Sequence, residues 1–176
     1  PRNREYERNM TPNGYRCELY YRNDTIGRFD VQRRIMDQLR TLEERGVFDE
    51  TVESTWHQIE TRESDGRPEA HATYADFEDW ARANDFSLEP AFDVRPRYVP
   101  GTTEIRETVI FPVVGLAIYD GAALQAVVPS SDEFSHYTVP EALEGFERAD
   151  IDRWLARFRG VTVDREAPHL PASATL

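Results

Sequence analysis

The chain has 176 residues, a length that fits one domain with a sizeable core, and its 33 acidic and 21 basic residues give a net charge of −12. This excess of negative charge argues against non-specific nucleic-acid binding, because such binding depends on basic residues that displace counterions from phosphates. No apolar run approaches the roughly 20 residues of a membrane span, and the N-terminus is polar, so we expect a cytoplasmic protein with no signal peptide and no membrane association.

Every basic residue is arginine, and the sequence contains no lysine. Such a composition resembles that of proteins from salt-accumulating halophilic archaea, where high ionic strength screens the repulsion between acidic side chains. The planar guanidinium group also pairs with carboxylates through two hydrogen bonds. The composition therefore favours a halophilic archaeal origin, with the codon bias of a GC-rich genome as the alternative explanation.

The sequence contains none of the common catalytic or metal-binding motifs. Its single cysteine, Cys17, rules out an intramolecular disulfide, a redox pair and a cysteine-rich zinc site. The four histidines are scattered, and the phosphate-binding, dinucleotide-binding and serine-hydrolase motifs are missing. We therefore expect a non-enzymatic protein without a cofactor or a metal site. The alternative is a hydrolase or transferase that uses His57 beside Trp56 together with nearby carboxylates.

The first predicted elements after a polar arm over residues 1–14 are a strand, a helix and a strand. Apolar residues alternate through 15–22 and again through 49–60, which predicts two strands, and Cys17 falls on the buried face of the first. The helix between them is expected to have Asp30 as its N-cap and Gly46 as its stop. Its apolar stripe consists of Val31, Ile35, Leu39 and Leu42.

The rest of the chain is predicted to alternate between helices and strands, bounded by capping boxes and turn residues. A helix over 73–85, with a capping box at Thr73 and Asp76, is followed by an extended edge strand within 87–104 and one central strand over 107–121. A turn at Asp120 and Gly121 leads into a strand over 124–129. The chain then forms a helix over 136–148 with a capping box at Thr138 and Glu141, a short helix over 150–160, and a loose tail over 161–176.

This order of elements predicts a single α/β domain over residues 15–160. It resembles the thioredoxin-like fold, with a βαβ unit, a helix, a β-hairpin and a helix, followed here by an extra C-terminal helix. The resemblance places Pro112 where such folds have a cis-proline; a trans proline at a bulge or at the first residue of a strand is the alternative. The segment "RNDTIGRF" occupies the place of the redox motif but lacks cysteine. A ferredoxin-like α+β sandwich is the competing fold.

Several stretches of the chain also resemble one family of proteins. They are "CELYYR", "RRIMDQLRTLEERGVFDE", "FEDWARANDFSLEPAF", "FPVVGLAIYDGAALQAVVPSSD" and "HYTVPEALEGF", and they span most of residues 15–147. The family consists of small haloarchaeal proteins described as helix-turn-helix domain proteins. The resemblance implies a role in transcriptional regulation.

The segment "RRIMDQLRTLEERGVF" has two interpretations. It resembles the recognition helix of a winged-helix domain, in which case the exposed residues Arg33, Arg34 and Arg40 would contact DNA. However, the segment lies between two predicted strands, and too little chain precedes it for the two helices that a winged helix requires. We therefore favour a packing helix within a βαβ unit, whose arginines pair with acidic residues on a solvated face.

The function that we favour is non-enzymatic binding or regulation. Open α/β sheets bind ligands at the carboxyl ends of their strands, and the first predicted strand ends in a polar loop with two arginines. The candidate residues there are Arg22, Asn23, Asp24, Arg28 and Pro112. Arginine would bind a small anionic ligand or a protein partner through paired hydrogen bonds. The alternative is a helix-turn-helix regulator that binds DNA through Arg33, Arg34 and Arg40; the sequence leaves the oligomeric state open.

Overall fold

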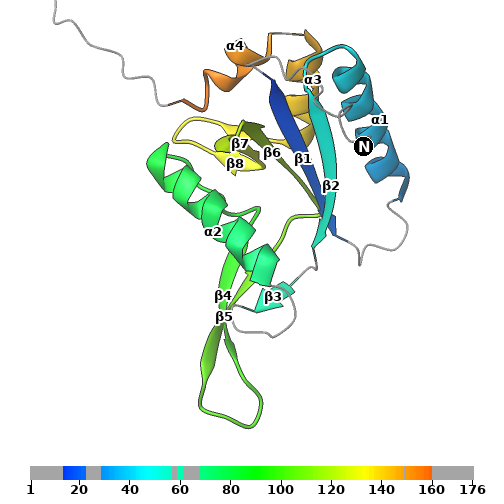
Figure 1. Ribbon diagram of the computed structural model, residues 1–176. Helices are drawn as coiled ribbons and strands as arrows, with labels where there is room; N and C mark the ends of the chain where they lie inside the picture. Colours follow the sequence, from blue (N-terminus) through cyan, green and yellow to red (C-terminus); the bar gives the residue numbers. More distant parts are fainter. Residues whose placement is uncertain (1–13, 23–28, 57–58, 62–67, 149, 160–176) are drawn as a thin grey trace, which may run out of the picture.

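The computed structural model describes residues 14–22, 29–56, 59–61, 68–148 and 150–159, which form a single α/β domain (Figure 1). The predictions of a polar arm and a loose tail, and those for Asn23, Asp24, Arg28 and His57, lie outside these residues. No helix in the described ranges is long and apolar enough to cross a membrane.

A mixed four-stranded sheet forms the centre of the molecule. Its strands are, in spatial order, β2 (Glu50–Trp56), β1 (Tyr15–Arg22), β6 (Val114–Asp120) and β7 (Ala123–Val128). β1 and β2 run parallel, with Cys17 opposite Thr51, and the other neighbours are antiparallel. The predicted hairpin between β6 and β7 is confirmed, because Gly121 has a φ of +58 in the turn that joins them.

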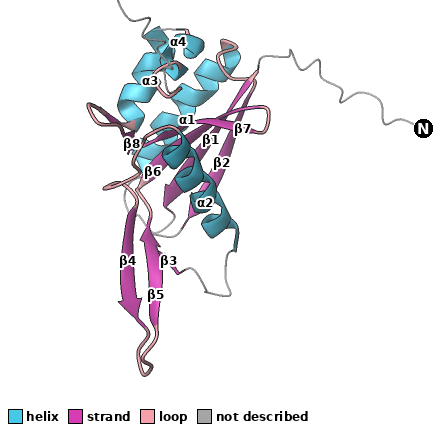
Figure 2. Ribbon diagram, turned by 90° about the vertical axis from the view of Figure 1, so that its left-hand side faces the viewer, coloured by secondary structure: helices cyan, strands magenta, loops and turns pink. Residues whose placement is uncertain are grey.

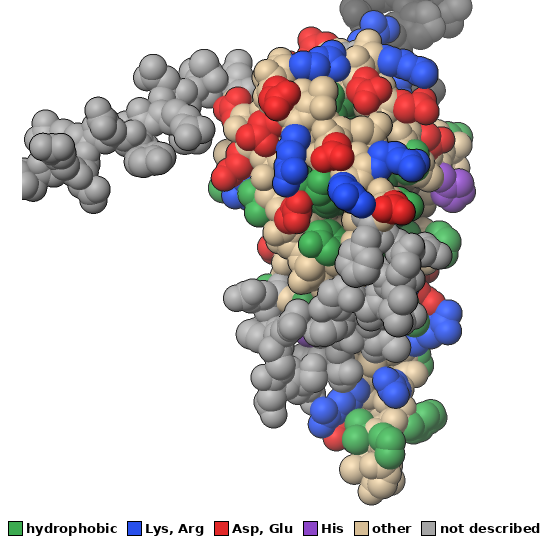
Figure 3. Space-filling model, turned by 90° about the vertical axis from the view of Figure 1, so that its right-hand side faces the viewer, with side chains coloured by type: hydrophobic (Ala, Val, Ile, Leu, Met, Phe, Trp, Pro, Cys, Tyr) green, Lys and Arg blue, Asp and Glu red, His purple; other side chains and the backbone are tan. Residues whose placement is uncertain are grey.

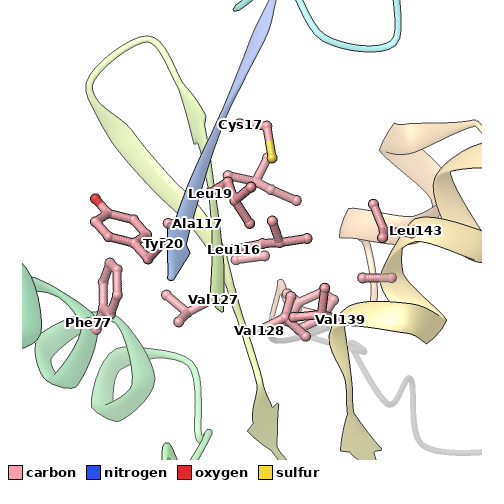
Figure 4. Close-up of a cluster of buried hydrophobic side chains, with 14 of the residues drawn as sticks. Cys17, Leu19, Tyr20, Phe77, Leu116, Ala117, Val127, Val128, Val139 and Leu143 are labelled. Carbon is pink, nitrogen blue, oxygen red and sulfur yellow. The ribbon is translucent and has the colours of Figure 1, made fainter. Parts of the chain in front are cut away.

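Helices cover both faces of this sheet. α1 (Phe29–Glu44) and α3 (Val139–Arg148) lie on one face, and α2 (Pro68–Ala83) lies on the other (Figure 1). α4 (Ile151–Leu155) follows α3 at one end of the sheet, where the Tyr15 hydroxyl donates to Asp152. Figure 4 shows the consequence for the core: Leu19 and Leu116 point toward Leu143 of α3, while Tyr20 points toward Phe77 of α2. A two-layer ferredoxin-like sandwich has helices on only one face, so it does not describe this arrangement. The thioredoxin-like assignment stays a prediction.

The predicted packing helix is confirmed, since α1 connects the neighbouring parallel strands β1 and β2. Ile35, Leu39 and Leu42 are buried, but Val31, which the sequence placed on the same stripe, is 48% exposed. The helix begins at Phe29, so Asp30 lies in its first turn and is not its N-cap. The helix ends as predicted: Gly46 has a φ of +75, and its N–H donates to the Glu43 carbonyl at 2.9 Å.

Several boundaries differ from the prediction. The strand predicted over 49–60 ends at Trp56, and Ile59–Thr61 pairs in a different sheet. The apolar stretch 107–121 is not one strand, because the chain leaves one sheet at Ile110 and enters another at Val114. Pro112 lies between them, where its missing N–H costs no ladder hydrogen bond. Its peptide bond is trans, because the cis bonds among the described residues precede Pro90 and Pro129.

The helix predicted over 73–85 begins earlier, at Pro68. Thr73 therefore lies inside α2, and the proposed capping box with Asp76 is wrong. Proline suits the first turn of a helix, because its fixed φ is helical and its missing N–H would have no partner there. The polar residues around Pro68 show no apolar periodicity, so the sequence pattern placed the start too late.

The second sheet has three strands and extends away from the first. They are β3 (Ile59–Thr61), β5 (Ile105–Ile110) and β4 (Asp93–Tyr98), in that order. A pair of two-residue strands, β8 (Ser130–Ser131) and β9 (His136–Tyr137), precedes α3. The predicted capping box of α3 is confirmed: the N–H of Thr138 donates to the Glu141 carboxylate at 3.1 Å, and the N–H of Glu141 donates to the Thr138 hydroxyl at 3.4 Å.

Candidate nucleic-acid interface

The exposed face of α1 carries arginines, but it is not a basic surface. Arg33 and Arg40 each form an ion pair with the acidic residue three positions earlier, Asp30 at 3.1 Å and Asp37 at 4.0 Å. Asp30, Asp37 and Glu44 are spaced by seven residues, so they form an exposed acidic row along the same face. Figure 3 shows the result, with acidic and basic side chains interspersed over this side of the molecule.

Two of the five predicted strand-end residues lie together. The N–H of Arg22 donates to the Val113 carbonyl at 3.0 Å, and its guanidinium group donates to the Phe111 carbonyl at 3.5 Å. Arg22 therefore lies beside the turn that contains Pro112, whose own carbonyl accepts a hydrogen bond from the Trp56 indole at 3.0 Å. This proximity confirms the expected neighbourhood of the two residues, while a ligand there stays a prediction.

One element of the described structure is a projecting two-stranded ribbon. It consists of β4, β5 and the connecting residues 99–104, and it projects from the body in both ribbon views (Figures 1 and 2). Its base is held by two fully buried rings that flank it in the sequence, Phe92 and Phe111. Both rings pack against Trp56 of β2, with ring centroids 5.7 and 4.6 Å away. The core therefore fixes the direction in which the ribbon extends.

The ribbon carries three arginines on one face, which exceed the two acidic residues paired with them. Side chains alternate between the two faces of a strand, and Arg97 lies directly opposite Arg106 in the register of β4 and β5. Arg95 lies two residues before Arg97, so all three guanidinium groups belong to the same face; we call these three residues the basic face. Arg95 is paired with Asp93, and Arg106 with Glu104 at 3.2 Å. The lower part of Figure 3 shows basic side chains on the ribbon.

The opposite face of the ribbon becomes apolar toward its end. Tyr98 and Ile105 are directly paired across the strands and are 72% and 55% exposed. Beyond them the chain turns through Val99, Pro100, Gly101 and Thr102. The N–H of Thr102 donates to the Val99 carbonyl at 3.1 Å, and Gly101 has a φ of +81. These are the features of a type II turn with proline and glycine at its centre, so the ribbon has an ordered end. We call residues 98–105 the tip.

A groove of about 430 Å³ lies between α2 and the base of the ribbon. Its apolar lining includes Leu88 and Val109. Its charged lining consists of three carboxylates and one guanidinium group, those of Glu78, Glu89, Glu107 and Arg82. These carboxylates disfavour an anionic ligand or a phosphate there. Among the described residues, no group of three or more His, Cys, Asp or Glu side chains is placed to hold a metal ion.

The sequence interpretation missed the basic face. Residues 87–104 were expected to form an extended edge strand, and their prolines obscured the pattern of a hairpin. Two signals were nevertheless present: Arg95 and Arg97 alternate with apolar residues, and the Pro-Gly pair at 100–101 is typical of a tight turn. The position of Arg106 on the same face could not be predicted, because it depends on the register between two strands.

The chain was compared with protein-family models, curated proteins and solved structures. A family model described as a helix-turn-helix domain matches residues 9–150, which is most of the chain. No curated protein and no solved structure matches the chain.

Proposed function

Because the chain belongs to this helix-turn-helix domain family, we propose that it is a regulatory protein that binds DNA, and that the basic face of the ribbon contacts the nucleic acid. The proposal depends on one observation, the position of Arg95, Arg97 and Arg106 together on one side of an element that projects from the body. The proposed setting is the salt-rich cytoplasm of a halophilic archaeon, which the acidic, lysine-free composition supports. The proposed role is non-enzymatic.

The helices offer less suitable surfaces for this role. A helix-turn-helix reads DNA with the exposed second helix of a pair, whereas α1 lies between two strands and has an acidic row on its exposed face. α3 and α4 follow each other directly, but α4 has five residues and buries Ile151, Trp154 and Leu155 against the core. α1 and α4 therefore do not present a basic surface of the length that the major groove accommodates.

The ribbon has suitable dimensions and charge. The major groove of DNA accommodates a two-stranded β-ribbon as well as a helix, and the ribbon projects from the acidic body (Figures 1 and 2). Arginine is suited to phosphates and guanine because its guanidinium group donates two parallel hydrogen bonds. In a chain of net charge −12, DNA binding requires such a local basic surface, because the body as a whole repels the phosphates.

The proposal can be tested by a matched pair of triple variants. Arg95, Arg97 and Arg106 are replaced by glutamine in one variant, and Arg33, Arg34 and Arg40 in the other, so both lose the same charge. Binding to fluorescently labelled duplex DNA is measured by anisotropy over a range of KCl concentrations. Since each phosphate contact contributes about 0.9 to the slope of log K against log salt, the ribbon variant should lose about 2 to 3 from that slope. The helix variant should keep it.

Two results would contradict the proposal. If the wild-type protein binds neither a random duplex pool nor a selected sequence at any salt concentration in which it is folded, it is not a DNA-binding protein. If the helix variant loses binding while the ribbon variant retains it, α1 is the interface. Circular dichroism of each variant provides the control for folding.

A further inference from the structure

The tip of the ribbon combines an apolar surface with an ordered turn, and the basic face does not explain it. The exposed large hydrophobic side chains of the described residues are Val31, Tyr98, Ile105 and Phe134, and two of these four form one cross-strand pair at the tip. Pro100 extends the exposed apolar surface at the end of the turn. Exposing a Tyr–Ile pair costs solubility and gives nothing to the core, which indicates a contact with another molecule.

From this arrangement we propose that the tip is a wedge that enters the minor groove of double-stranded DNA and unstacks a base step, so that the protein bends the DNA that it binds. The proposal rests on the proposed DNA-binding function and specifies how the ribbon engages its target. Proteins that bend DNA from the minor groove insert an apolar side chain such as Pro, Ile or Phe between bases and hold the adjacent backbone with basic residues. Tyr98, Ile105 and Pro100 would provide the apolar surface.

The order of residues along the ribbon fits this mode of binding. Arg97 and Arg106 directly precede and follow the Tyr98–Ile105 pair, on the opposite face. When the tip enters between two bases, these guanidinium groups lie at the level of the flanking phosphates, where they would offset part of the cost of unstacking. Glu104 pairs with Arg106 at 3.2 Å and Glu107 is exposed nearby, but the three arginines outnumber these two carboxylates over residues 95–107. This small excess of positive charge favours a polyanion over an apolar protein partner as the molecule that covers the tip.

The turn gives the tip the rigidity that a wedge requires. Besides the hydrogen bond from Thr102 to Val99, the N–H of Val99 donates to the Glu104 carbonyl at 3.0 Å. The Thr102 hydroxyl donates to the Val99 carbonyl at 3.1 Å and accepts from the N–H of Glu104 at 3.2 Å. A tip held by these bonds, with Pro100 at its end, loses little conformational entropy on insertion.

The test separates bending from binding. A duplex of about 30 base pairs, labelled at its ends with a donor and an acceptor dye, reports bending by energy transfer, and anisotropy on the same duplex reports binding. We compare the wild-type protein with Tyr98→Ala/Ile105→Ala, with the conservative Tyr98→Phe, and with Phe134→Ala, which removes an aromatic ring that is 87% exposed elsewhere on the surface. A second duplex with a two-nucleotide bulge, for which part of the bending cost is already met, serves as a pre-bent probe.

We expect the wild-type protein, Tyr98→Phe and Phe134→Ala to raise the energy transfer and to prefer the bulged duplex. The double variant should bind with an affinity about tenfold lower, within the range for the loss of one base–aromatic contact, and leave the energy transfer unchanged. Wild-type binding without bending and without preference for the bulge would overturn the wedge and leave the proposed function intact. No binding to either duplex would overturn both. A wild-type dimer that the double variant converts to a monomer, with DNA affinity unchanged, would overturn the wedge and identify the tip as a protein contact.

Discussion

Truncation of one leucine tests whether α1 is a packing helix. Leu39 lies in the middle of α1 and is fully buried. Leu39→Ala removes three buried carbon atoms, which at about 0.8 kcal/mol each costs about 2.4 kcal/mol in transfer free energy. The cavity left behind adds to this cost, and measured Leu→Ala substitutions in cores range from about 2 to 5 kcal/mol. We therefore expect the free energy of unfolding to fall by about 3 kcal/mol.

The assay is urea unfolding followed by circular dichroism, at a KCl concentration in which the wild-type protein is fully folded. For a domain of this size the expected loss corresponds to a Tm lowered by about 6 to 12 °C. Val31→Ala is the matched control: it truncates a residue that the sequence places on the same stripe but that is 48% exposed, so it should cost about 0.5 kcal/mol or less. Equal effects of the two substitutions would refute the packing of α1 against the sheet.

Two further predictions concern single side chains. Cys17 is fully buried, and burial raises the pKa of its thiol, so iodoacetamide should modify it in urea but not in the native protein; rapid native modification would show that β1 is not a central strand. The carboxylate of Asp132 accepts three hydrogen bonds: from the N–H of Phe134 at 2.8 Å, from the Tyr137 hydroxyl and from the N–H of Ser135. These bonds hold the pKa of the Asp132 carboxyl below the usual 3.8. The stability that the ionised Asp132 contributes is therefore present above about pH 4 and is lost as the pH falls through the lowered pKa. Asp132→Asn should make the Tm fall less steeply with pH below about pH 4. An unchanged slope in that range would contradict this assignment.

Much of the central sheet could be predicted because its signals are local. The spacing of Ile35, Leu39 and Leu42 followed by Gly46 specifies the length and the buried face of α1 without knowledge of the rest of the chain. The alternation in β1 correctly places Cys17 on a buried face. Tyr20 falls on the opposite face, with the polar residues Glu18 and Arg22, yet it is buried as well. It is buried because α2 covers that face too, which no pattern within β1 reveals.

The parts that could not be predicted depend on contacts between distant segments. The stretch 109–119 is apolar on both faces whether it forms one strand or two. Only the pairing partners of Ile110 and Val114 show that it belongs to two sheets. The candidate site likewise has one part that could be predicted from the sequence and one part that could not. Arg22 and Pro112 were expected to be neighbours because the resemblance to a thioredoxin-like fold places Pro112 near the end of the first strand. The basic face, by contrast, exists only in the register that places Arg97 opposite Arg106.

Hydrogen–deuterium exchange with and without bound DNA tests the central claim most directly, since it reports the interface without any substitution. If the ribbon is the binding element, DNA should slow exchange of the backbone amides over residues 95–106 and leave those over residues 30–45 unchanged. Slower exchange confined to α1, with the ribbon unaffected, would contradict the account and identify the arginine-bearing helix as the surface that contacts DNA.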